Sequence, residues 1–198
     1  DFDALLRLRV GEFDRRRVEG MVNVPLRPDI ALRVNGVYNE SDGWVQDATT
    51  GRDLRPEESW AFRAALRWNL AAQTVATLTW DRDEIDQLAR PAFGVVPMDS
   101  GDGTVPFPPD PATFLDPRTA PVFNDVIGNE ESRELDAMTL AVVHELGWAE
   151  LRSTTAWRQF DTLNREDEDG TNRVATYFDT ANIEDNESWY QEFKLSGK

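Results

Sequence analysis

The side chains that most often carry out catalysis or bind metals are scarce in this chain of 198 residues. Cysteine is absent and histidine occurs once, at His144, which excludes disulfide scaffolds, thiolate chemistry and histidine-based zinc clusters. Carboxylates are plentiful, because 37 Asp and Glu stand against 21 Lys and Arg and give a formal net charge of −16. A general nucleic-acid-binding protein needs a basic surface instead. We therefore expect no enzyme, no metal site, no cofactor and no nucleic-acid partner.

Two acidic segments could nevertheless bind a cation. The first covers residues 81–86, with four carboxylates that we expect at the start of a long loop, where solvation explains them without a bound ion. The second, residues 167–170, has the composition of a calcium loop, but Arg165 and Thr176 stand where an EF-hand needs acids. Neither segment predicts a metal site.

The secondary structure is indicated by an alternation of apolar and polar residues, which is typical of strands with one exposed face. The alternation predicts eight strands, at residues 2–10, 17–26, 32–39, 60–70, 76–81, 137–146, 151–158 and 188–195. Residues 56–72 and 135–146 also fit amphipathic helices, so a soluble α+β domain is an alternative. Because all eight segments agree, strands are favoured.

The connections between the predicted strands alternate in length. Short turns are expected at 27–29, 71–73 and 147–148, and long loops at 40–58, 87–130 and 163–187. The first connection, around 14–16, is an exception because it is short. The loop at about 87–130 holds eight of the eleven prolines, which exclude a regular element and indicate a functional or covering loop.

Alternation alone does not say whether the apolar face meets a protein core or lipid. A soluble sandwich or lipocalin-like barrel turns this face inward, whereas a transmembrane barrel turns it outward around a wet lumen. Aromatic residues at strand ends, such as Trp60 and Trp68, and long loops at one end only favour the membrane. The sequence thus predicts an all-β, antiparallel, up-and-down transmembrane β-barrel with long extracellular loops and short periplasmic turns. Its polar face would carry the arginines Arg63, Arg67, Arg152 and Arg158.

Several segments resemble barrel strands of TonB-dependent outer-membrane receptors. They are residues 10–26 (VGEFDRRRVEGMVNVPL), 30–38 (IALRVNGVY), 42–45 (DGWV), 49–54 (TTGRDL), 62–68 (FRAALRW), 151–158 (LRSTTAWR) and 191–196 (QEFKLS). The first is similar to the first barrel hairpin of the family, and the next two to its third strand. The resemblance covers nearly the whole chain except the loop at 87–130, and the order and spacing of the segments carry it.

The resemblance implies a barrel of 22 strands with a plugged lumen, in which residues 1–198 are a partial barrel domain of about eight strands. It implies energised uptake of a ferric siderophore, or of a similar bulky nutrient such as cobalamin or an oligosaccharide, across the bacterial outer membrane. The partners would be the TonB–ExbB–ExbD complex, acting through a plug, and the surrounding lipid bilayer and lipopolysaccharide. Since neither a plug, a TonB box, a signal peptide nor a closing strand is recognisable, we expect a fragment.

Two other functions remain open: a complete small outer-membrane barrel with a structural or adhesive role, and a soluble acidic β-rich ligand-binding domain. The four arginines are expected to pair with Glu145, Glu192 or plug acids, or to guide an anionic cargo. His144 is expected at a membrane interface, since it lies on an apolar face near a turn. Aromatic residues of the long loop would pack the loop on itself or contact ligand; they are Phe93, Phe107, Phe114 and Phe123.

Overall fold

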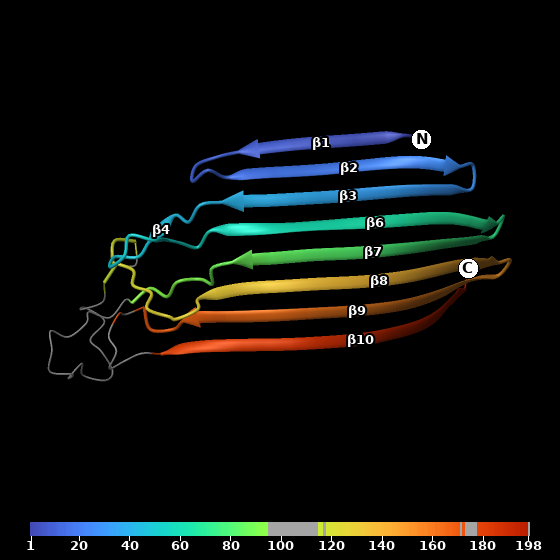
Figure 1. Ribbon diagram of the computed structural model, residues 1–198. Coiled ribbons are helices and arrows are strands. Elements are labelled where there is room, and N and C mark those ends of the chain that lie inside the picture. The colour runs from blue at the N-terminus through green and yellow to red at the C-terminus, as the bar shows by residue number, and fades with distance from the viewer. Residues whose placement is uncertain (95–114, 117, 171, 173–177, 198) are drawn as a thin grey trace.

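The computed structural model describes residues 1–94, 115–116, 118–170, 172 and 178–197, and its main feature is one antiparallel sheet of eight strands (Figure 1). The strands of this sheet, in spatial order, are β1 (Asp3–Val10), β2 (Arg16–Arg27), β3 (Ile30–Ser41), β6 (Glu57–Ala71), β7 (Thr74–Gln87), β8 (Glu130–Leu146), β9 (Ala149–Asp167) and β10 (Asp179–Gly197). A separate hairpin consists of β4 (Val45–Gln46) and β5 (Asp53–Leu54). Phe107, Phe114 and Thr176 lie outside the described residues.

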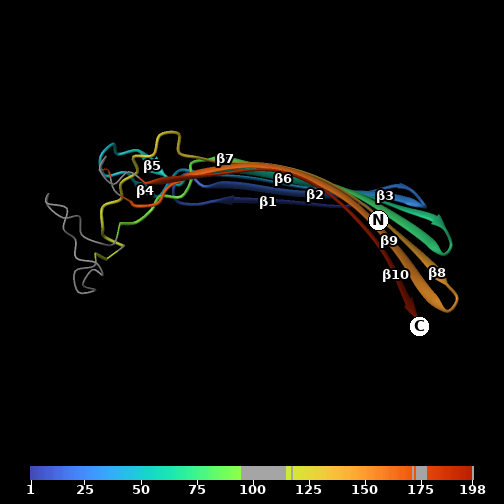
Figure 2. The ribbon, with the colours of Figure 1, turned by 90° about the horizontal axis from the view of Figure 1, so that it is seen from below.

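The predicted fold class is confirmed: each long strand pairs with the next, antiparallel, in an up-and-down order of eight strands. The two segments that also fitted helices form β6 and β8, so the helical alternative is wrong. The sheet is a curved wall that does not close, with β1 and β10 as its two edges (Figure 2). The described residues include no helix that is long and apolar enough to cross a membrane.

Several strands extend further than predicted. The strand β7 continues to Gln87, so the acids of residues 81–86 lie within a strand, and their predicted place in a loop is wrong. The strand β10 already begins at Asp179, which shortens the predicted loop at 163–187 to residues 168–178. In both regions polar residues occupy both faces, so the alternation that marks a half-apolar strand is absent although the hydrogen-bonded ladder continues.

All short turns lie at one end of the sheet and all longer connections at the other (Figure 1). The short turns are residues 28–29, 72–73 and 147–148, and the other connections are residues 11–15, 42–56, 88–129 and 168–178. The first connection is short, yet it lies at the long-loop end, because antiparallel pairing places successive connections at alternate ends. The predicted arrangement of loops and turns is therefore confirmed.

No large apolar side chain of the eight-stranded sheet is buried in the described part of the chain. Leu78, Trp80 and Leu140 expose about two fifths of their surface. A buried apolar cluster exists only outside the sheet, where Val45 and Leu54 meet residue 122 at the long-loop end. A soluble sandwich would need a second layer over the apolar side chains of the sheet, and the described residues provide none.

Candidate functional site: the two faces of the sheet and its long-loop end

The two faces of the sheet differ in chemistry, and the register of the strands decides which residues share a face. One row of directly opposed residues across five strands consists of Val34, Ala64, Trp80, Met138 and Trp157. The neighbouring row, which points to the other side, consists of Arg33, Ala65, Thr79, Thr139 and Ala156. We call the side of the first row the apolar face and the side of the second row the polar face.

Tryptophans bound the apolar face. On β6, Trp60 and Trp68 lie four residues to either side of Ala64, and a strand of that length measures about 26 Å. The ring nitrogens reach acids: Trp68 donates to Asp29 (3.2 Å), and Trp80 and Trp157 donate to acids of neighbouring strands at 3.2 and 2.8 Å. Rings that are apolar on one side and hydrogen-bonded at the other are typical of the aromatic girdle of a membrane barrel.

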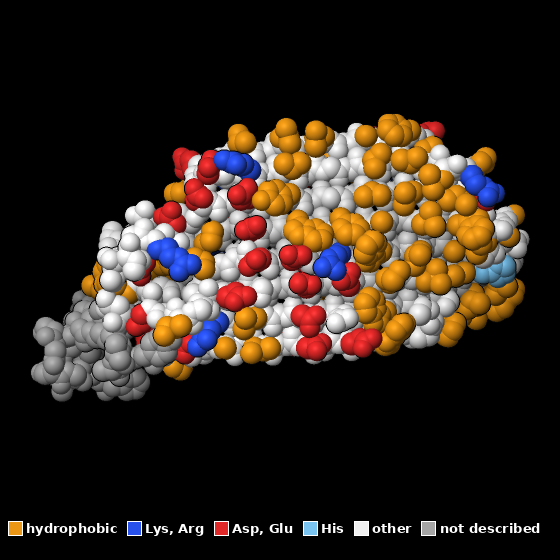
Figure 3. Space-filling view, viewed as in Figure 1, with side chains coloured by type: hydrophobic (Ala, Val, Ile, Leu, Met, Phe, Trp, Pro, Cys, Tyr) orange, Lys and Arg blue, Asp and Glu red, His pale blue; other side chains and the backbone are white. Residues whose placement is uncertain are grey.

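Above the tryptophans, toward the long loops, the apolar face becomes acidic (Figure 3). Four carboxylates stand directly opposite one another on β7 to β10: Glu84, Glu134, Asp161 and Asp185. Like charges that stand opposite each other destabilise a sheet. This destabilisation is smallest where water screens the charges. Arg82 also offsets part of this charge, because it contacts Asp136 at 2.7 Å and Glu134 at 3.4 Å. The acidic row thus marks the limit of the apolar band.

At the other limit of the band, near the short turns, His144 lies on the apolar face (Figure 3). Its Nδ1 is 2.9 Å from the hydroxyl of Thr74 on the neighbouring strand. A hydroxyl partner satisfies one ring nitrogen without supplying the carboxylate that would orient a catalytic base. The predicted place of His144 at a membrane interface stays a prediction.

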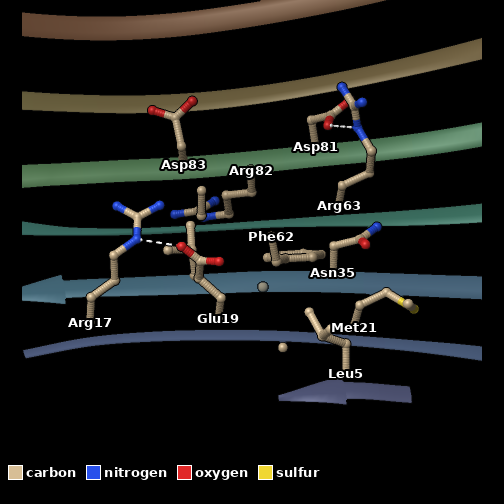
Figure 4. Close-up of a pocket in the computed structure, with 14 residues that line it drawn as sticks. Leu5, Arg17, Glu19, Met21, Asn35, Phe62, Arg63, Asp81, Arg82 and Asp83 are labelled. Carbon is tan, nitrogen blue, oxygen red and sulfur yellow. Dashed lines mark hydrogen bonds and ion pairs between the residues drawn. The ribbon is translucent and has the colours of Figure 1, made fainter. Parts of the chain in front are cut away.

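Ion pairs line the polar face (Figure 4). Arg63 is hydrogen-bonded to Asp81 on the next strand, and Arg17 contacts Glu19 at 2.6 Å. These side chains, together with Asn35 and the apolar Leu5 and Met21, line a shallow hollow of about 620 Å³ that extends from β1 to β7. Intermingled opposite charges with amides between them suit a surface that contacts water, and they contrast with the hydrocarbon side chains on the reverse of the same strands.

All four arginines predicted from the sequence lie on the polar face: Arg63, Arg67, Arg152 and Arg158. The structure does not bring them into one cluster. The partner of Arg63 is Asp81, and that of Arg152 is Glu150 at 3.4 Å, so the pairing predicted for these two with Glu145 or Glu192 is replaced by nearer acids.

Among the described residues, no acid balances the charges of the other two predicted arginines. Neither Arg67 nor Arg158 forms an ion pair with another described residue. The guanidinium of Arg158 lies over the ring of Phe160, 5.3 Å from its centre. A cation held only by an aromatic ring or by water remains available to an anion, so these two residues are the candidates for contact with a charged ligand.

A residue that sequence analysis missed organises the long-loop end. The Asp47 carboxylate, 4% exposed, accepts hydrogen bonds from the backbone of Thr49 (3.0 Å), from the backbone and hydroxyl of Thr50 (2.6 and 2.8 Å) and from the backbone of Asn124 (2.8 Å). Burial alone would raise the pKa of Asp47, but these hydrogen bonds outweigh it and lower the pKa. The signal was the segment Asp-Ala-Thr-Thr-Gly at residues 47–51, which is typical of a side-chain-capped turn.

The acidic segment at 167–170 forms a second capped turn. Asp167, 3% exposed, accepts hydrogen bonds from the backbones of Asp169 and Gly170, both at 2.9 Å. Burial raises the pKa of Asp167, and it also raises that of Asp125, to which Asp169 adds its negative charge. In the described ranges, no three His, Cys, Asp or Glu side chains come together as metal ligands.

The fold is similar to a part of larger proteins of known structure. Similar solved structures include the ferric-catecholate import receptor Fiu from E. coli K12 in its open form, with a TM-score of 0.66 and 18% identity over 100% of this chain and 31% of that chain. They also include the FpvAI–pyocin S2 complex, with a TM-score of 0.65 and 13% identity over 98% of this chain and 25% of that chain. No protein-family model and no curated protein matches the chain.

These two likenesses, at identities below a fifth, show the fold alone. The chain spans about a third of the length of the first structure and a quarter of the second. The activities in their names belong to those proteins.

Proposed function

We propose that the chain is part of the barrel wall of a TonB-dependent receptor in the bacterial outer membrane. The observation that carries this proposal is the contrast between the two faces of one sheet: an exposed apolar band that carries hydrogen-bonded tryptophans, and an ion-paired polar face behind it. Lipid on the first side and a water-filled lumen on the second satisfy both faces. The open edges β1 and β10 support a larger barrel over a complete small one.

The receptor would transport its cargo and catalyse no reaction. The cargo would enter at the long-loop end, and the TonB–ExbB–ExbD complex would supply energy through a plug in the lumen. A ferric siderophore is the first candidate, since one structural neighbour is a ferric-catecholate import receptor; cobalamin and oligosaccharides belong to the same class of bulky nutrients. The apolar face would contact the bilayer and lipopolysaccharide.

Single cysteines test this placement directly, because the chain has none of its own. Leu78 and Leu140 are opposed on the apolar face, and Thr79 and Thr139 are opposed on the polar face. We expect spin labels on Leu78→Cys and Leu140→Cys, in the full-length gene product in lipid vesicles, to be relaxed more by oxygen than by a water-soluble nickel chelate. Labels on Thr79→Cys and Thr139→Cys should show the reverse, since oxygen concentrates in hydrocarbon and the chelate stays in water.

Equal access of the nickel chelate to all four labels would contradict the proposal and favour a soluble domain. Protection of all four positions from both reagents would also contradict it, because it would place both faces inside packed protein. The four labelled positions lie in two neighbouring rows of the sheet. A difference in membrane depth therefore does not explain a difference in reagent access between them.

The unbalanced arginines give a second test, of the charge of the cargo. We expect Arg67→Gln with Arg158→Gln to slow uptake of an anionic ferric siderophore about tenfold at low salt, because lumenal cations raise the local concentration of anions. The effect should shrink as salt is added. Arg152→Gln is the matched control, since Glu150 already balances that charge. Unchanged uptake by the double variant would contradict a guiding role for these arginines.

A further inference from the structure

We propose that the apolar face of β7 to β10 binds a lipid whose headgroup carries an amine: an open hollow holds its acyl chain, and carboxylates beyond the hollow hold the amine. The inference rests on the proposed function, because it requires that this face meets lipid. The hollow measures about 310 Å³. The side chains that line it on this face are Leu78, Met138, Leu140, Thr155, Trp157 and Trp189.

Two tryptophans form the upper wall of the hollow. Trp157 and Trp189 are directly opposed, with ring centres 6.4 Å apart and planes tilted by 50°. The Trp157 ring is held in place because its Nε1 donates to Glu187 at 2.8 Å. A hollow of this volume is at the lower end of small-molecule sites and suits a single hydrocarbon chain. A helix about 10 Å wide would lie across it without filling it.

Carboxylates without a partner stand beyond the tryptophans, toward the long loops (Figure 3). Asp161 and Asp185 are directly opposed, four residues beyond Trp157 and Trp189, and Glu187 lies between the two rows on β10. All three carboxylates are exposed, and none forms an ion pair with another described residue. The apolar hollow therefore has a rim with unbalanced negative charge.

The nearest arginines on this face already have partners. Arg82 contacts Asp136 at 2.7 Å and Glu134 at 3.4 Å, and Arg165 contacts Asp179 at 3.0 Å. The acids of the described ranges do not converge as metal ligands. An ammonium group, with one compact charge and three hydrogen-bond donors, suits carboxylates that stand side by side on neighbouring strands.

The distance between the hollow and its acidic rim matches one lipid. The four residues from Trp157 to Asp161 measure about 13 Å along the strand, or about 10 Å of membrane depth at a tilt of about 40°. One leaflet contributes about 15 Å of hydrocarbon. A lipid with its amine at Asp161 and Asp185 therefore brings the lower part of its chain into the hollow. A headgroup with only negative charge is repelled there.

The strand β3 offers a comparison at the same depth. Val34 lies in the row of Met138, and Leu32 lies in the row of Leu140. In the row that holds Asp161, however, β3 carries Tyr38. A lipid beside β3 thus meets apolar side chains without the unbalanced acids, so headgroup preference should differ between the two places.

The experiment uses the full-length gene product in phosphatidylcholine vesicles that contain a small fraction of phosphatidylethanolamine or of phosphatidylglycerol. Both probe lipids carry the same diazirine near the end of one acyl chain, and mass spectrometry locates the attachment after illumination. We compare attachment at residues 138–140 and 155–157 with attachment at residues 32–34. We expect this ratio to be about fivefold higher for phosphatidylethanolamine, as for one charge near a membrane surface, and the preference to shrink as salt is added.

A double variant tests the acidic rim. Asp161→Asn with Asp185→Asn keeps the size of both side chains and removes two opposed like charges, a change that does not destabilise a sheet. The variant should give nearly the same ratio for both lipids. Glu192→Gln is the matched control, because it removes a carboxylate from the polar face of β10, and it should keep the preference of the parent.

Three results would overturn the proposal. They are an equal ratio for the two lipids in the parent, a preference that persists in the double variant, and attachment at residues 32–34 without attachment at the hollow. The third result would mean that protein, such as a cationic amphipathic helix, covers the hollow.

Failure of this inference is distinguishable from failure of the proposed function. Attachment at residues 32–34 without a headgroup preference at the hollow keeps the receptor proposal and removes the lipid site. If neither region is attached, the apolar face does not meet lipid. The spin-label measurement then fails as well, and both proposals are overturned.

Discussion

Replacing Ala64 with arginine is expected to destabilise the bilayer-embedded protein by about 2–4 kcal/mol, whereas the same replacement at Ala65 is expected to cost less than about 1 kcal/mol. The two alanines are neighbours on β6 and lie on opposite faces of the sheet. Ala64 opposes Val34 and Trp80 on the apolar face, and Ala65 opposes Arg33 on the polar face.

The difference arises from the medium that each side chain enters. Ala64 lies midway between Trp60 and Trp68, about 13 Å along the strand from each, and the nearest charged pair on this face, Arg82 and Asp136, is in the row of Phe62, two residues away. An arginine at Ala64 therefore enters the apolar band and leaves it only by reaching toward that row. At Ala65 the new guanidinium meets water and stands opposite Arg33. Water screens this repulsion, which limits the cost to that of an exposed like-charge pair.

The measurement is the free energy of unfolding in guanidinium chloride, followed by tryptophan fluorescence, of the full-length gene product in vesicles. Ala64→Ser is the control, because it replaces the alanine side chain with a polar one that carries no charge. Similar losses at the two positions would mean that both faces meet the same medium, and this would remove the basis of the receptor proposal.

Replacing Asp47 with alanine is expected to release the loop lobe, which we define as the β4–β5 hairpin with residues 122–124, at a cost of about 3 kcal/mol. The reason is that the change leaves the backbone N–H groups of Thr49, Thr50 and Asn124 without their acceptor, and each hydrogen bond to a charged group contributes about 1.5–3 kcal/mol in a non-additive way. Asp47→Asn keeps one carbonyl acceptor and should cost roughly half as much.

Hydrogen exchange at single amides separates this local effect from a global one. Protection should fall at Ala48 and Asn124, while the amides of β6 to β9 keep theirs. Equal loss of protection throughout the sheet, or no loss at residues 48–51, would contradict the assignment of Asp47 as the fastening residue of the loop lobe.

The same carboxylate sets the pH range over which the loop lobe stays attached. Since the folded state lowers the pKa of Asp47, its contribution is fully present above the ordinary aspartate pKa of about 3.9 and is lost as the pH falls through the lower, folded value. Between neutral pH and about pH 4 the lobe should therefore stay closed in the parent protein, and Asp47→Ala should remove the acid transition below it.

Much of the sheet could be predicted from the sequence, because a strand with one apolar face repeats every second residue. The prediction failed where that contrast ends. On β7 beyond Trp80 and on β10 before Trp189, both faces are polar, so the strands continue without a signal. The faces of Arg63 and Arg67 followed from alternation alone, since adjacent residues on a strand point to opposite sides.

The partner of Arg63 could not be predicted, because it depends on an irregularity. In the hairpin of β6 and β7, Ala71 opposes Thr74, but the register shifts between Asn69 and Ala71, so that Arg63 opposes Asp81. An uninterrupted ladder from the same turn would place Arg63 opposite a residue one position later, Arg82. A one-residue slip of this kind exchanges faces and charges together, and nothing in the local composition marks it.

The length of the strands has a consequence for how a cargo meets the proposed receptor. The strands β9 and β10 have 19 residues each, which is about 63 Å of extended chain and, at a tilt of about 40°, nearly 50 Å of height, roughly twice the apolar band of about 25 Å. The upper half of the wall would stand as a stiff collar in the surrounding water. The loop lobe at its rim would then lie well outside the hydrocarbon, so that a cargo meets this rim before it reaches the bore.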